Sequence, residues 1–194
     1  MTIVHNPAKD VLLVVPVHPP TDALLRATYR THAWFEAHDK EEFLRSVAHV
    51  EVAVTSGSSG IRAALMERLP ALRLVACFGV GVDGVDLQHA RAHGIAVTNT
   101  PEVLTEEVAD FALALLLATL RQLPQADRYV REGKWLEAAF PLTGSLRGRR
   151  IGILGMGRIG QAIAHRCAAF GVPVAYHGPR PKPELAYPYH RSVL

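Results

Sequence analysis

Short apolar runs alternate with amphipathic segments along the first hundred residues. A continuous apolar run at residues 11–17 is typical of a parallel strand that is buried on both faces. The same reading places strands at residues 33–35, 50–55, 72–78 and 95–98, and helices at 21–30, 40–49, 61–69 and 86–93. Strands that alternate with helices predict a parallel sheet with right-handed crossovers. We therefore expect an α/β, flavodoxin-like domain of about five strands over residues 1–100.

Residues 101–194 are expected to form a second domain, with Pro101 at the hinge. A long apolar helix is predicted at 103–120, with acidic residues near its start and Arg121 at its end, an order that suits the helix dipole. A helix this apolar is core, or core plus a subunit interface. A second, polar helix is predicted at 125–134, followed by a linker at 140–149.

The strongest chemical signal lies at residues 150–160, which read R-I-G-I-L-G-M-G-R-I-G. Gly155, Gly157 and Gly160 stand in G-x-G-x-x-G spacing between an apolar strand and a helical pattern, the context that a dinucleotide site requires. Gly155 permits a tight turn, Gly157 lets the backbone approach a pyrophosphate, and Gly160 lets the helix pack closely on the strand. The helix N-terminus then attracts the phosphates. The alternative is a glycine turn with a purely structural role.

The next predicted strand, at 172–176, indicates which dinucleotide is bound. An NAD site usually places Asp or Glu near the end of this strand, to bond the ribose 2′-hydroxyl. Here the run is H-G-P-R-P-K, so Arg180 and Lys182 are two cations where a 2′-phosphate would lie. The pattern favours NADP(H), with NAD(H) still possible. The alternative is a solvated basic loop.

Two further glycine loops follow predicted strands, at residues 57–60 and 79–84. Ligands of parallel sheets bind outside the carboxyl ends of the strands, where these loops lie. The first loop is expected to run straight into a helix, so its N–H groups could hold a carboxylate. Ser58 or Ser59 could instead cap that helix. The sequence does not separate these two readings.

Composition narrows the class of protein. The 194 residues are 49% hydrophobic and 20% charged, with a formal net charge of +3, and no block of Lys and Arg suggests nucleic acid. The longest apolar run, 111–120, is too short to span a bilayer, and the N-terminus does not resemble a signal peptide. Cys77 and Cys167 form no C-x-x-C, so we expect no disulfide and no metal site. A soluble, cytoplasmic protein is expected.

In the order of its parts, the chain resembles the D-2-hydroxyacid dehydrogenase family, and within it the glyoxylate/hydroxypyruvate reductase branch. The matching pieces are F-G-V-G-V-D-G-V-D at 78–86, V-T-N-T-P at 97–101, V-L-T-E-E-V-A-D-F-A at 103–112, G-K-W at 133–135 and G-I-L-G-M-G-R-I-G-Q-A-I-A at 152–164. They span most of the chain, and their combination in this order is highly specific.

The resemblance implies a substrate domain followed by the first half of a Rossmann NAD(P)-binding domain. It implies hydride transfer between a nicotinamide and C2 of a small 2-keto or 2-hydroxy acid. It further implies that the residue matching Trp135 lies on an arm near a subunit interface, as in a homodimer. By the same resemblance, the substrate carboxylate meets backbone N–H groups at Ser58, Ser59, Gly60, Val80 and Gly81, while Thr105 lines the nicotinamide side and Arg158 and Ile159 lie over the pyrophosphate.

The chain also departs from the family. The family's catalytic Arg, Glu and His follow the second Rossmann strand, and no segment up to Leu194 matches them. His165, His177 and His190 lie in other contexts and are expected to be structural or solvated. We therefore expect a truncated reductase that lacks turnover by itself. The alternative is a non-catalytic fragment that binds NADP or a partner subunit.

Overall fold

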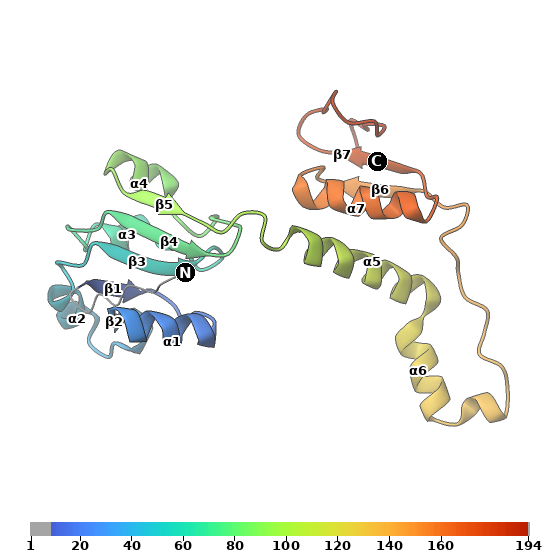
Figure 1. Ribbon diagram of the computed structural model, residues 1–194, viewed down its shortest axis with the longest axis horizontal. Helices are drawn as coiled ribbons and strands as arrows, with labels where there is room; N and C mark the ends of the chain where they lie inside the picture. Colours follow the sequence, from blue (N-terminus) through green and yellow to red (C-terminus); the bar gives the residue numbers. More distant parts are fainter. Residues whose placement is uncertain (1–8, 194) are drawn as a thin grey trace. The chain divides into compact units, whose positions relative to one another are not determined.

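The computed structural model describes residues 9–193, which divide into two compact units on either side of the Pro101–Glu102 bond (Figure 1). This boundary lies one residue from the predicted one. The expectation about a signal peptide concerns a segment that begins outside the described residues. Within 9–193, no helix has the length and apolarity needed to cross a membrane.

The first unit is built on a five-stranded sheet whose order is β2-β1-β3-β4-β5. All four strand pairings are parallel. This is the flavodoxin-like order 2-1-3-4-5, which confirms the predicted fold class. The strands are β1 (Asp10–Leu13), β2 (Arg30–Ala33), β3 (Val52–Ser56), β4 (Leu74–Phe78) and β5 (Ala96–Thr98).

Helices cover both faces of this sheet, so each face has its own core. Val11 and Leu13 point to the face that carries Leu25 of α1, whereas Leu12 between them belongs to the cluster on the other face. Such double burial explains why the β1 segment is apolar at successive positions. The helices of this unit are α1 (Pro19–Thr28), the 3₁₀ turn η1 (Trp34–Glu36), α2 (Lys40–Ser46), α3 (Ala63–Met66) and α4 (Leu87–Ala92).

Several helices and strands begin or end at other residues than predicted, because contacts with distant parts of the chain determine where they stop. The last N–H that the β1 segment donates to β3 is that of Val14, bonded to Val54 O at 2.9 Å, and Pro16 has no N–H with which to continue. The predicted strand at 33–35 is wrong. β2 ends at Ala33, and the following 3₁₀ turn places Trp34 against Phe43, with ring centroids 5.8 Å apart.

The predicted helix at 61–69 is also wrong over most of its length, because α3 has only four residues. Ile61 instead forms an isolated parallel bridge with Val85, and its carbonyl accepts the Asp86 N–H at 3.1 Å. A residue held in this extended pairing cannot start a helix. The first glycine loop therefore does not run straight into a helix.

The second unit contains a two-stranded parallel sheet, formed by β6 (Ile151–Leu154) and β7 (Val174–His177). Between these strands the chain forms α7 (Arg158–Ala169), as the pattern predicts. The unit begins with α5 (Thr105–Arg121), α6 (Leu123–Arg131) and the 3₁₀ turn η2 (Lys134–Leu136). Its core includes Leu113 of α5, Ile153 of β6, Ala164 and Cys167 of α7, and Tyr176 of β7.

A cluster of charges joins α5 to α7. The Arg166 guanidinium of α7 binds Glu106 at 2.7 Å and also Asp110, both on α5. These carboxylates raise the pKa of Arg166 above its usual range. The acidic residues near the start of α5 therefore anchor a neighbouring helix, besides lying at the favourable end of their own helix dipole.

The Gly160→Ala variant tests the close contact of α7 with the glycine turn. A Cβ at Gly160 would overlap the Gly155 carbonyl oxygen and would lie 3.3 Å from Ile153 Cγ2. Helix propensity alone favours alanine by up to about 1 kcal/mol, but overpacking costs about 1–3 kcal/mol. We expect a lower free energy of unfolding in urea. Gly152→Ala is the matched control, since a Cβ there meets no atom within 4 Å. Equal stability of the two variants would contradict the steric argument.

Candidate functional site

The glycine turn of the second unit leaves the N-terminus of α7 open. Gly155 has a φ of +91°, a conformation that favours glycine, and its N–H donates to His177 O at 2.8 Å. Gly157 is the N-cap residue, and no side chain caps the helix. A Cβ at Gly157 would meet no atom within 4 Å. The turn therefore presents uncapped N–H groups to open space, which is a suitable geometry for binding an anion.

The start of α5 and the N-terminal half of α7 border a hollow between these two helices. Thr105 and Arg158, which were predicted separately, both line it. Arg158 is exposed, and its Nε lies 2.9 Å from a carboxylate oxygen of Glu102. His165 lines the same hollow. Ile159 is half-buried beside Arg158 on the first turn of α7.

The basic loop after β7 lies at the same edge as the glycine turn, because β6 and β7 are parallel. Its backbone is held by tyrosines: the Lys182 N–H donates to Tyr176 Oη at 2.7 Å, and Tyr189 Oη donates to Gly178 O at 3.0 Å. Arg180 is exposed and Lys182 is half-buried. Neither side chain has an ion-pair partner within residues 9–193.

In the first unit, the two glycine loops follow the adjacent strands β3 and β4 and touch each other. The Gly84 N–H donates to Gly57 O at 2.9 Å. A Cβ at Gly57 would overlap the Gly81 carbonyl, and a Cβ at Gly60 would overlap Gly84. The loops pack backbone against backbone, which only glycine permits at these positions.

This packing leaves some of the predicted N–H groups available and engages others. The Ser59 N–H donates to Ser56 Oγ at 3.2 Å, and the Gly60 N–H donates to Ser56 O at 2.8 Å. The N–H groups of Ser58, Val80 and Gly81 have no acceptor in the described part of the chain.

The second glycine loop is positioned by residues that follow β5. The Thr100 N–H donates to Gly79 O at 2.9 Å, and the Asn99 amide donates to Val80 O at 2.7 Å. These bonds hold the carbonyl groups of Gly79 and Val80, whereas the N–H groups of Val80 and Gly81 bond no acceptor in the described residues.

The alternative that Ser58 or Ser59 caps a helix is wrong. The N-cap residue of α3 is Arg62, and no side chain bonds the first N–H groups of that helix. The loop is instead stabilised from within, by a 2.7 Å bond from the buried Thr55 hydroxyl to Gly60 O.

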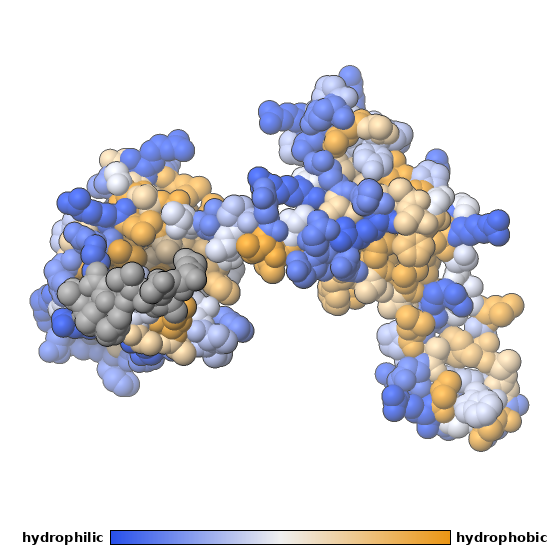
Figure 2. Space-filling view, viewed as in Figure 1, coloured by the Kyte–Doolittle hydropathy of each residue, from blue (hydrophilic) through white to orange (hydrophobic). Residues whose placement is uncertain are grey.

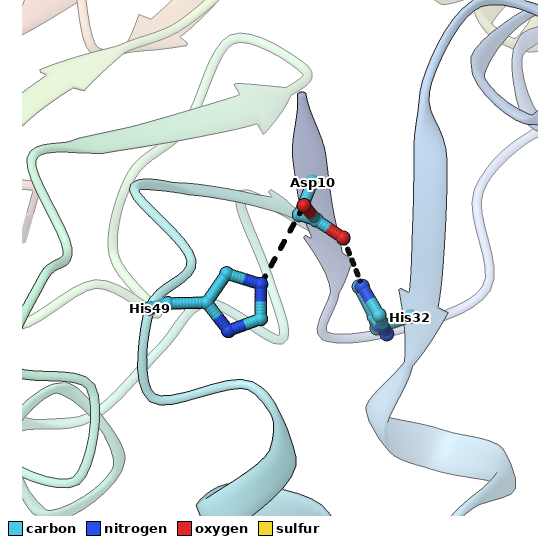
Figure 3. A group of neighbouring side chains, drawn as sticks. All are labelled: Asp10, His32 and His49. Atoms are coloured by element: carbon cyan, nitrogen blue, oxygen red, sulfur yellow. Dashed lines mark hydrogen bonds and ion pairs between the residues drawn. The ribbon is translucent and has the colours of Figure 1, made fainter. Parts of the chain in front are cut away.

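A group of side chains at the opposite edge of this sheet was not anticipated (Figure 3). The Asp10 carboxylate lies 2.7 Å from His32 Nε2 and 3.5 Å from His49 Nε2. The hydrogen bond from His32 lowers the pKa of Asp10, and the nearby Arg30 guanidinium and His49 act in the same direction. The sequence carried no signal for this group, because its members are far apart in the chain and form no recognisable spacing.

The two cysteines, Cys77 and Cys167, are buried. Neither Cys77 nor Cys167 forms a disulfide. Burial raises the pKa of both thiols, which disfavours the reactive thiolate. We therefore assign them to the core and not to the site.

The fold and site together define an α/β protein with a flavodoxin-like sheet and a dinucleotide-type glycine turn. Residues 11–182 match the model of the D-isomer specific 2-hydroxyacid dehydrogenase family, catalytic domain. The chain belongs to this family, which confirms the resemblance seen in the sequence.

Several similar relatives are named glyoxylate or hydroxypyruvate reductases. The chain is 40% identical over 185 residues to a glyoxylate/hydroxypyruvate reductase A from Arabidopsis thaliana, covering 95% of this chain and 59% of the relative. It is 41% identical over 170 residues to a glyoxylate reductase from Thermococcus onnurineus, covering 84% of this chain and 51% of the relative. The chain thus spans between half and three-fifths of these proteins.

Solved structures of 2-hydroxyacid dehydrogenases are also similar to this chain. A 2-hydroxyacid dehydrogenase from Ketogulonicigenium vulgare superimposes with a TM-score of 0.88 at 37% identity, covering 98% of this chain and 59% of that one. An NADPH-dependent glyoxylate/hydroxypyruvate reductase from Sinorhizobium meliloti, in complex with NADP and malonate, superimposes with a TM-score of 0.82 at 44% identity, covering 94% of this chain and 57% of that one.

Proposed function

We propose that this chain carries the substrate domain and the first part of the cofactor domain of an NADPH-dependent reductase for small 2-keto acids, of the glyoxylate or hydroxypyruvate type. The observation that carries the proposal is the position of the basic loop. Arg180 and Lys182 lie at the same edge of the second sheet as the uncapped N-terminus of α7. The Sinorhizobium relative supports it, because that NADPH-dependent reductase was solved with NADP.

The cofactor would be held by two kinds of group. The backbone N–H groups at Arg158, Ile159 and Gly160 would receive the pyrophosphate, since none of these is needed inside the helix. Such backbone contacts do not distinguish NADP from NAD. That choice falls to the side chains of Arg180 and Lys182, which would bind the 2′-phosphate. Bound NADPH would supply the hydride.

The substrate carboxylate would be received by the touching glycine loops of the first unit. Ser58, Val80 and Gly81 provide the available N–H groups, while Ser59 and Gly60 shape the loop through their bonds to Ser56. The malonate in the Sinorhizobium structure is a dicarboxylate, which suits a site of this class in that relative. Thr105 would lie on the nicotinamide side.

Proton transfer is not assigned to any residue of this chain. The family's Arg, Glu and His motifs match no segment of it, and His177 is engaged through Nδ1, 2.9 Å from His190 O. We therefore propose that residues 1–194 bind the cofactor without turnover. A purified sample given NADPH and glyoxylate is expected to show no NADPH oxidation above a blank.

The Arg180→Ala variant tests the choice of cofactor. A hydrogen bond to a charged group contributes roughly 1.5–3 kcal/mol, so the dissociation constant for NADPH should rise about 10- to 150-fold. The constant for NADH should stay unchanged, because NADH has no 2′-phosphate. Both constants are measured by fluorescence titration of the purified chain.

Arg147→Ala is the matched control for this experiment. Arg147 is an exposed cation that precedes β6, whereas the glycine turn follows that strand. Its loss should leave both dissociation constants unchanged. Equal weakening of NADPH and NADH by Arg180→Ala would show that the loop does not read the 2′-phosphate.

The carboxylate loops are tested by amide NMR on ¹⁵N-labelled protein titrated with glyoxylate or malonate. The amide signals of Ser58, Val80 and Gly81 should move with ligand, and that of Ser59 should move less because its N–H is already bonded. Ser58→Pro removes an N–H and should weaken binding about 10-fold or more. Ser58→Ala keeps the N–H and serves as the control. Equal effects of both variants would rule out recognition through this N–H group.

We also propose that the second unit forms a two-fold dimer contact through α5, α6 and the segment after them. Phe111 and Leu115 on α5 are 62% and 52% exposed, and Trp135 is 57% exposed. Figure 2 shows orange, apolar residues among blue ones over α6 and the segment after it, at the lower right of the view. Closed dimers are the commonest oligomers, and exposed apolar side chains that lie near one another favour a subunit contact.

Phe111→Asp tests the dimer contact. A carboxylate in an apolar interface is left without a partner, so the variant should sediment as a monomer at micromolar concentration while the unmodified chain sediments as a dimer. Leu24→Asp on α1 is the control, since Leu24 is 48% exposed but lies in the first unit. A monomeric unmodified chain would contradict the proposal.

A further inference from the structure

Three side chains meet at the edge of the first sheet where its strands begin (Figure 3). Asp10 is the first residue of β1, His32 lies in β2, and His49 lies just before β3. The carboxylate and imidazole atoms that they offer all lie within 4.8 Å of one another. The glycine loops follow the opposite ends of the strands, so this cluster is separate from the proposed substrate site.

The sheet itself brings the three residues together. Asp10 lies opposite Arg30 in the parallel register of β1 with β2, and His32 follows two positions later on the same face. The Arg30 N–H also donates to Lys9 O at 3.1 Å, which holds the start of the two strands together. The Asp10 side chain is only 13% exposed. Its carboxylate is therefore held in position by neighbouring residues and does not move freely at the surface.

The donor set selects a class of ion. Two imidazoles and one carboxylate suit Zn²⁺ and the neighbouring divalent transition metals, whereas Mg²⁺ and Ca²⁺ prefer oxygen ligands alone. Zinc bonds to such ligands are about 2.0–2.2 Å, so tetrahedral ligands lie about 3.3 Å apart. The ligand atoms that the three residues offer lie within 4.8 Å of one another. His32 Nε2 lies 2.7 Å from Asp10 Oδ1 and His49 Nε2 lies 3.5 Å from Asp10 Oδ2, so the two imidazoles face different oxygens of one carboxylate. Rotation of these side chains would bring one oxygen and both nitrogens around a common ion.

We propose that Asp10, His32 and His49 bind one Zn²⁺ ion, which joins β1, β2 and the segment before β3. Three protein ligands leave a fourth position for water, and the 59% exposure of the His49 side chain makes the site accessible to solvent. The ion would stabilise the first unit, because it binds ligands that are assembled only in the folded chain.

One cation lies close enough to compete. Arg30 Nη1 is 3.7 Å from Asp10 Oδ1, but the Arg30 side chain is 67% exposed and has room to turn away. The alternative to the proposal is therefore a metal-free network in which the Asp10 carboxylate bonds only His32 and Arg30. A second rival is metal binding at His89 and His93 on and beside α4, whose rings stack with centroids 4.0 Å apart.

The test is a titration of the tag-free 194-residue chain with Zn²⁺ against a chromophoric chelator. The unmodified chain should bind one ion. His49→Ala removes a ligand with little risk to folding, because the side chain is largely exposed. Loss of an outer-shell partner typically weakens binding 10- to 100-fold, so loss of a direct ligand should weaken it by more than about 100-fold.

Two matched controls separate the site from its rivals. His38→Ala removes an exposed histidine of the same unit, and the double variant His89→Ala/His93→Ala removes the stacked pair. Both should bind Zn²⁺ as the unmodified chain does. Asp10→Asn is a second variant of the site, which preserves the size of the side chain but removes its charge, and it should also weaken binding.

Thermal unfolding gives an independent readout. Zn²⁺ should raise the Tm of the unmodified chain and of His38→Ala, and it should leave His49→Ala unchanged. The proposal is overturned if the unmodified chain binds no zinc, if His49→Ala binds as tightly as the unmodified chain, or if only the His89→Ala/His93→Ala variant loses binding.

Discussion

Parallel strand pairing is the constraint on which the rest of this structure depends. Parallel strands need a crossover, so the chain returns through a helix or loop after each one and every strand ends at the same edge of its sheet. In the first unit that edge brings together the loops at 57–60 and 79–84. In the second it brings the glycine turn beside the basic loop after β7. The strand starts meet at the other edge, where Asp10, His32 and His49 lie.

At the edge where the strands of each sheet end, glycine residues give the backbone a geometry that is suited to binding an anion. Gly57 meets Gly81, and Gly160 meets Gly155, at distances that exclude a side chain. Backbone packed so closely leaves N–H groups facing solvent where side chains would otherwise cover them. A carboxylate or pyrophosphate would then be bound by peptide dipoles, with no need for a buried cation. In this proposal, charged side chains would be needed only to recognise the 2′-phosphate. Binding of the pyrophosphate and the choice between NADP and NAD would then depend on different groups.

The long helix α5 belongs both to the core of the second unit and to the proposed dimer contact. Ala109 and Leu113 on one side are buried, and Leu113 belongs to the core with β6, β7 and α7, whereas Phe111 and Leu115 on the other side are exposed. The salt bridges of Arg166 to Glu106 and Asp110 hold α7 on the buried side. A helix anchored in this way presents its second apolar face in a defined orientation, which is the property that a subunit interface requires.

Local patterns in the sequence were enough to predict the flavodoxin-like sheet, the glycine turn with α7, and the basic loop, because each depends on neighbouring residues. Features set by distant contacts were not predictable. Ile61 pairs with Val85 and shortens α3, and Trp34 packs on Phe43 where a strand was expected. The cluster of Asp10, His32 and His49 exists only because the sheet register brings three separate segments together. These features depend on the tertiary structure, because the contacts join residues that are far apart in the sequence and no local pattern contains both partners.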